Sequence, residues 1–188
     1  MPCFLTKNIK HSCVYDAGGV ASIFLLDIRD FISYIFRDDK DFTECYVSEI
    51  RAVAKYIELS SVAETNFIET NDSSIYKQEL TTFIRTMEAE KLSSLLIASA
   101  NKYLVSYITN QGQAFTFGSD GGASLSFTQQ TGQLGESSGY QITISKQSIY
   151  PQFEVKVNEL FKSPVWILEE GKWNGEGIWT REGIWKTN

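Results

Sequence analysis

A nucleophile beside a base is the simplest catalytic arrangement, and the only histidine of the chain, His11, is followed by Ser12 and Cys13. A serine or cysteine nucleophile needs its base within hydrogen-bond reach. Side chains of successive residues in an extended chain point to opposite faces, so adjacency in the sequence does not bring these groups together. We therefore interpret His11 as a surface or loop histidine, not a catalytic base.

Metal-binding and phosphate-binding patterns are equally incomplete. Asp38, Asp39 and Asp41 lie in a charged stretch, but the ordered glycine and glutamate of an EF-hand loop are missing, so we predict a solvated loop. The segment from Gly118 to Gly122 lacks the lysine of a phosphate-binding loop and precedes a strand, which indicates a turn. No two of the 23 acidic residues stand out as a glycosidase pair. The sequence predicts no enzyme, no metal and no cofactor.

Tryptophan is concentrated at the C-terminus. Residues 171–188 divide into three six-residue repeats that begin with glycine and carry tryptophan at the third position. An even repeat keeps each tryptophan on the same face of an extended chain, which predicts one aromatic stripe. The residues predicted to contact a partner are all four tryptophans and the isoleucines of two repeats: Trp166, Trp173, Trp179, Trp185, Ile178 and Ile184.

This stripe has three interpretations. It could form terminal strands that close the protein's own core. It could dock on a neighbouring subunit or a partner, because buried aromatic side chains dominate interface energies. It could also stack against the apolar face of a sugar ring.

Composition restricts the class of protein. The chain of 188 residues is 43% hydrophobic and 13% aromatic, which indicates a globular fold rich in strands. The net charge of -6 and the lack of a basic patch argue against tight nucleic-acid binding. Cys3, Cys13 and Cys45 form no CxxC pair and predict free thiols in a reducing compartment. We expect no membrane span, no secretory signal and synthesis in a cytoplasm.

The sequence predicts mostly short strands as the elements that position the residues discussed above. Strands are expected at residues 20–28, 46–53, 55–61, 103–109, 114–117 and 140–144, and near Leu125 and Phe127. The strand pattern continues over residues 65–85, where residues 75–85 are expected to form a strand. Helical spacing of leucines predicts one helix over residues 87–102, capped by Thr86. Residues 110–113 predict a hairpin turn.

These elements predict a mainly β (α+β) fold. We expect an antiparallel β-sandwich or barrel with one packed helix. This domain should span residues 1–160, and a strand-like, Trp-rich arm should span residues 161–188.

The order of turns and strands is similar to that of a known family. Its landmarks are Asn110-Gln-Gly112, Phe115-Thr-Phe-Gly118, Gly121-Gly122 and Tyr140-Gln-Ile-Thr-Ile144. Over residues 1–150 the chain resembles tail-tube-like virion proteins of tailed bacteriophages, especially those of Bacteroidota-infecting and crAss-like phages. The resemblance implies a homo-oligomeric ring, hexamer-like or a multiple of six, around a lumen through which DNA passes without specific binding. It implies no catalytic residues.

Two functional hypotheses follow. The first is a structural protein of the virion tail (tube, hub or connector-type ring component) that assembles with itself and other tail proteins. The alternative is a carbohydrate- or host-surface-binding module that uses the Trp stripe. The Trp-rich arm departs from the pattern of the family, which puts a pure tube role in question.

Overall fold

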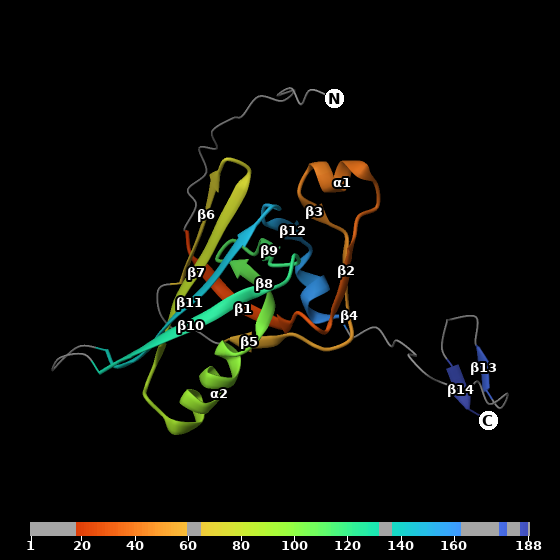
Figure 1. The fold of residues 1–188 in the computed structure, drawn as a ribbon. Coiled ribbons are helices and arrows are strands. Elements are labelled where there is room, and N and C mark those ends of the chain that lie inside the picture. Colours follow the sequence, from red (N-terminus) through yellow and green to blue (C-terminus); the bar gives the residue numbers. More distant parts are fainter. Residues whose placement is uncertain (1–17, 60–64, 132–136, 163–176, 180–184, 188) are drawn as a thin grey trace.

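The computed structural model describes residues 18–59, 65–131, 137–162, 177–179 and 185–187 (Figure 1). It confirms a mainly β fold in which a ten-stranded sheet packs with one main helix. The strands of this sheet are β1 (Val20–Asp27), β3 (Tyr46–Val47), β5 (Ile57–Leu59), β6 (Asn66–Asp72), β7 (Ile75–Arg85), β8 (Lys102–Thr109), β9 (Ala114–Phe117), β10 (Ala123–Gln130), β11 (Gly139–Ser148) and β12 (Phe153–Val155). The remaining elements are β2 (Phe31–Ile35), β4 (Glu49–Ala52), α1 (Asp39–Thr43), α2 (Ala89–Ser99), the 3-10 helix η1 (Val157–Phe161), β13 (Gly177–Trp179) and β14 (Trp185–Thr187).

The large sheet folds back on itself at β8. On one side β8 pairs with β1, and on the other it pairs with β9 and, at its first residues, with β10. The strand order β10-β11-β7-β6 then forms a second layer, whose inner residues pack against those of β1 and β8. The expected sandwich is therefore built from one continuous sheet, and the β2–β4 hairpin and η1 pack on its far side.

The centre of the protein is apolar on both faces of β1. Ile23 and Leu25 belong to the core between the two layers of sheet, and Phe24 and Leu26 belong to the core under β2, β4 and η1. Each of these four side chains is at most 5% exposed. A strand covered on both faces reads as a continuous apolar run, which is why residues 23–26 show no alternation.

The predicted turns and the second layer are confirmed. The Gly112 N–H donates to the Thr109 carbonyl at 2.9 Å, and the Gly122 N–H donates to the Gly118 carbonyl at 2.8 Å. In β11 the side chains that alternate in the sequence, Tyr140, Ile142 and Ile144, are 0–1% exposed. The period-2 pattern therefore identified the inward face of β11.

Two predictions for local elements were wrong. The charged stretch expected to be a loop contains α1, because the Asp38 side chain accepts hydrogen bonds from the N–H groups of Lys40 and Asp41 and caps the helix. The helix expected at about residues 87–102 is confirmed and runs from Ala89 to Ser99, but its N-cap is Glu88, not Thr86. Thr86 has a φ of 73° and donates its N–H to the Ser138 carbonyl, so it ends β7.

The strand expected at residues 75–85 is confirmed as β7, and residues 66–72 before it form β6. β6 and β7 pair antiparallel from Asn66 opposite Thr81 to Asp72 opposite Ile75. The tight turn between them is made by Ser73 and Ser74, which both have positive φ. Because neither residue is glycine, the turn carries no clear signature in the sequence.

Candidate interaction surfaces

Several residues considered for chemistry in the sequence lie outside the described residues, namely His11, Ser12, Cys3 and Cys13. Cys45 is a free, half-buried thiol, and burial raises its pKa. Within the described ranges, no group of three or more His, Cys, Asp or Glu residues could hold a metal ion. No helix in the same ranges is long and apolar enough to cross a membrane.

The predicted partner residues are only partly placed. Trp166, Trp173 and Ile184 lie outside the described residues. Trp179 and Trp185 are register partners in the antiparallel pair β13–β14, and Ile178 lies opposite Lys186. The chain therefore reverses between these two tryptophans instead of continuing as one extended strand.

An aromatic pocket, not anticipated from the sequence, lies where β2, α1 and β12 meet. It has a volume of about 240 Å³, and its lining is six aromatic rings and two serines: Phe31, Ser33, Tyr34, Phe36, Phe42, Ser119, Tyr150 and Phe153. Phe153 is its centre, with ring centroids 5.6 Å from Tyr34, 5.7 Å from Phe36 and 6.1 Å from Phe42. Such edge and tilted ring contacts are individually favourable and hold the walls together.

A chain of buried hydroxyl groups supports the floor of the pocket. The Tyr34 hydroxyl lies 3.0 Å from Thr116 Oγ1, which lies 3.0 Å from Ser106 Oγ. Ser106 Oγ in turn lies 3.4 Å from the Tyr56 hydroxyl. Burial raises the pKa of Tyr34, and it raises the pKa of Tyr56 to about 12. These phenols stay neutral and tie β2 to β9 and β8.

The rim of the pocket is open to solvent. Phe42 is 48% exposed and Tyr150 is 37% exposed, and their ring centroids are 6.3 Å apart. Two exposed isoleucines belong to the segments beside this rim. Ile149 directly precedes Tyr150 in the chain and is 66% exposed. Ile75 is 47% exposed and directly precedes Tyr76, which lies opposite Ser148 in the pairing of β7 with β11. We call Phe42, Ile75, Ile149 and Tyr150 the rim patch.

A polar network fixes the segment that carries Tyr150. Gln78, which is 1% exposed, donates from Nε2 to Glu69 Oε2 at 2.8 Å and to the Tyr150 carbonyl at 3.2 Å. The backbone N–H of Gln152 donates to the same Glu69 oxygen at 2.8 Å, and the Tyr107 hydroxyl donates to Gln152 Oε1. Burial raises the pKa of Tyr107. The rim is therefore anchored to β6, β7 and β8.

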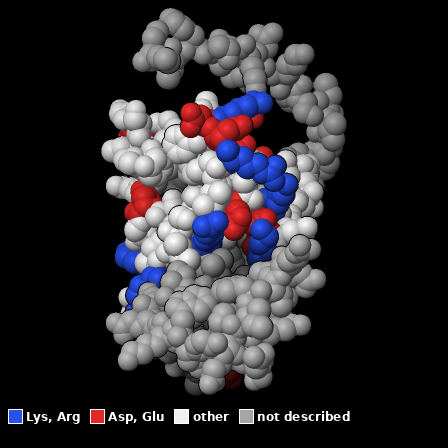
Figure 2. All heavy atoms as spheres, turned by 90° about the vertical axis from the view of Figure 1, so that its right-hand side faces the viewer, with Lys and Arg blue, Asp and Glu red and all other residues white. Residues whose placement is uncertain are grey.

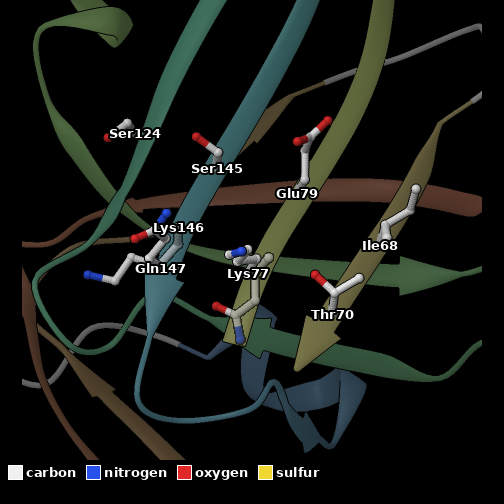
Figure 3. A pocket seen from close by; sticks show the side chains of 9 residues that line it. Ile68, Thr70, Lys77, Glu79, Ser124, Ser145, Lys146 and Gln147 are labelled. Atoms are coloured by element: carbon white, nitrogen blue, oxygen red, sulfur yellow. The ribbon is translucent and has the colours of Figure 1, made fainter. Parts of the chain in front are cut away.

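A second hollow lies on the solvent face of the second layer (Figure 3). It encloses about 470 Å³, and its lining comes from β6, β7, β10 and β11: Ile68, Thr70, Lys77, Gln78, Glu79, Ser124, Ser145, Lys146 and Gln147. Hydroxyl and amide groups dominate this surface. Its lysines are engaged within the chain, since Lys77 Nζ lies 3.1 Å from Asp72 and Lys146 Nζ lies 3.3 Å from Asp120.

Helix α2 presents a further apolar surface. Leu95 is its one buried residue, although the helix has 11 residues. The neighbouring Leu96 and Ile97 are 57% and 65% exposed. The helix packs an apolar stripe of Leu92, Leu95 and Ala98 against the core, so Leu96 and Ile97 lie outside this stripe and form a candidate contact surface.

Charges on the face shown in Figure 2 are mixed. Lysine and arginine side chains alternate with aspartate and glutamate, and no continuous basic area crosses the visible described surface. Ion pairs occupy several basic groups of the described residues; Arg29 lies 2.6 Å from Asp27, for example, and its hydrogen bond lowers the pKa of Asp27. The face offers no track for a phosphate backbone.

The chain matches no protein-family model, no curated protein and no solved structure.

Proposed function

We propose that the protein is a structural subunit that works by self-assembly, as a tube, hub or connector-type ring component of a bacteriophage virion tail. The observation that carries this proposal is the presence of two exposed apolar surfaces at separate ends of one subunit. One is the rim patch, and the other is formed by Leu96 and Ile97 of α2.

Strand β7 separates the two surfaces. Ile75 is its first residue, and α2 begins shortly after its last residue, Arg85. Eleven residues at about 3.3 Å each span roughly 35 Å. Figure 1 shows α1 and α2 at opposite ends of the body. A subunit with contact surfaces at both ends meets a different neighbour at each, which gives a ring when the rotation closes.

In this proposal the assembly is taken to be part of a phage tail because the sequence resembles tail-tube-like proteins. The net charge of -6 suits a channel that DNA passes through, because an acidic wall repels phosphates. In the same proposal the virion tail is the final location, the host cytoplasm is the place of synthesis, and other tail proteins are partners.

Light scattering on the purified full chain, combined with electron microscopy, tests this function. We expect concentration-dependent rings or tubes with hexamer-like symmetry or a multiple of six. A strictly monomeric protein at high concentration, encoded away from any phage gene, would overturn the proposal.

A carbohydrate- or host-surface-binding module is the second candidate. The hollow of Figure 3 supports it, because hydroxyl, amide and amine groups converge there and could hydrogen-bond a sugar. None of its nine lining residues is aromatic, so the stacking face would have to come from the tryptophans. On a broad glycan array the wild type should bind and Trp179→Ala should not; an array without any wild-type signal rules this candidate out.

A further inference from the structure

We propose that the aromatic pocket is a receptor for tryptophan, and that its occupant is one tryptophan of the Trp179–Trp185 pair of a neighbouring copy of this chain, with the other tryptophan lying against the rim. The inference rests on the proposed self-assembly and adds the contact that joins the subunits. It is carried by the size, the lining and the exposed rim of the pocket.

The size of the pocket selects the class of occupant. Its volume of about 240 Å³ lies below the roughly 300–1,000 Å³ of pockets that hold cofactors and drug-sized ligands. A single large side chain is a better match. The six rings of the lining favour another aromatic ring, since edge and offset contacts between rings add to the energy of burial.

The polar groups of the lining specify which aromatic ring. An indole carries one N–H donor and no acceptor, so a buried indole needs an acceptor beside it. Ser33 and Ser119 supply hydroxyl oxygens in an otherwise aromatic lining. A phenylalanine would leave these hydroxyls without a new partner, which favours tryptophan as the occupant.

The chain itself supplies tryptophan outside the described body. The body ends at Lys162, and all four tryptophans follow it. Trp179 lies far enough along the chain for an extended segment to reach roughly 50–60 Å from Lys162. A compact body of this size is roughly 40 Å across. The segment is therefore long enough to reach the pocket of an adjoining copy.

The pairing of β13 with β14 makes two tryptophans available together. Trp179 and Trp185 are directly opposite in the register. The receiving side has two exposed aromatic residues, Phe42 and Tyr150, on its rim.

Complementation between two full-length variants tests this contact. The tail variant is Trp179→Ala/Trp185→Ala, and the pocket variant is Phe42→Ala/Tyr150→Ala. By light scattering, each variant alone should associate about tenfold more weakly than the wild type, because each loses one side of the same contact. An equimolar mixture should recover wild-type affinity in a mixed complex, since an intact tail then meets an intact pocket.

Intrinsic fluorescence gives a second readout. Because every tryptophan lies in residues 166–185, tryptophan emission reports on the C-terminal segment alone. The wild type should show a blue shift that grows with protein concentration, and the pocket variant should lack it. Ile57→Ala, at an exposed residue of β5 that belongs neither to the pocket lining nor to the rim patch, is the control and should behave as the wild type.

The outcomes separate the two proposals. If the wild type assembles and either double variant assembles equally well, the pocket contact is wrong and the self-assembly proposal stands. A mixture that associates no better than its components also overturns the contact. A blue shift independent of concentration would mean that the segment occupies the pocket of its own chain. A wild type that never associates overturns the proposed function itself.

Discussion

The Tyr34 hydroxyl and Thr116 Oγ1 lie 3.0 Å apart, and this contact joins the β2–β4 hairpin to the large sheet. Tyr34 also forms part of the wall of the aromatic pocket, with its ring centroid 5.6 Å from that of Phe153. One side chain therefore holds the hairpin in place with its polar end and shapes the pocket with its ring. The stability of the hairpin and the geometry of the pocket depend on the same residue.

Tyr34→Phe removes the hydroxyl and keeps the ring. We expect the free energy of unfolding to fall by about 1 kcal/mol, because Thr116 loses one partner but keeps Ser106 at 3.0 Å. Chemical denaturation monitored by circular dichroism measures the change. Tyr46→Phe, at a half-buried tyrosine outside this chain of hydroxyls, is the control and should change stability by less.

The buried phenols make stability fall at high pH. Tyr56 has a pKa of about 12 in the folded protein, against about 10 in an unfolded chain. Below pH 10 the phenol is neutral in the folded and the unfolded state, so its full contribution to the free energy of unfolding is present. Between pH 10 and pH 12 only the unfolded state loses the proton, so the contribution is lost as the pH rises.

Tyr56→Phe should therefore flatten the decline. Raising the pH from neutral to 11 should lower the free energy of unfolding of the wild type by about 1 kcal/mol more than that of the variant. Denaturation curves at neutral pH and at pH 11 measure this difference. Equal losses in the two proteins would mean that Tyr56 titrates normally.

The turn before β10 requires glycine at position 122 for two reasons. Gly122 has a φ of 80°, and a Cβ at this position would lie 2.6 Å from Lys102 Cβ and 3.0 Å from the Tyr103 nitrogen. Gly122→Ala should destabilise the fold by about 3 kcal/mol or more, because backbone strain and a clash against β8 add. Thermal unfolding measures the effect.

Gly112→Ala separates the two causes. Gly112 has a nearly identical φ of 82°, but no atom lies within 4 Å of its would-be Cβ. Only the backbone strain should remain, about 1 kcal/mol. If the two variants are equally destabilised, the close approach to Lys102 and Tyr103 does not matter.

The alternation in the sequence predicted the second layer because its strands have one buried and one solvated face. In β11 the buried Tyr140, Ile142 and Ile144 alternate with polar residues that face solvent, so the period of two is visible. The same reasoning failed for β2. Its residues are mostly half-buried on both faces, so no period marks it as a strand.

The aromatic pocket could not be predicted because it depends on tertiary contacts. Phe36 and Phe42 are near each other in the sequence, but Phe153 of β12 comes from a distant part of it. Only the fold brings their rings together. The one available signal was the high aromatic content of residues 31–42, which does not say what the rings contact.

The exposed face of α2 gives the most direct prediction for self-assembly. Leu96→Lys/Ile97→Lys places two charges on side chains that are 57% and 65% exposed, so the folded subunit should tolerate them. In an interface, however, each lysine would be desolvated without a partner. We expect the variant to remain folded, with an unchanged circular dichroism spectrum, and to associate at least about tenfold more weakly in light scattering. Ile68→Lys/Thr70→Lys, at two exposed positions of β6 on the polar face of the second layer, supplies the same charge elsewhere and should leave association intact. Equal weakening by both variants would indicate a general effect of charge, and α2 would then not be a contact surface.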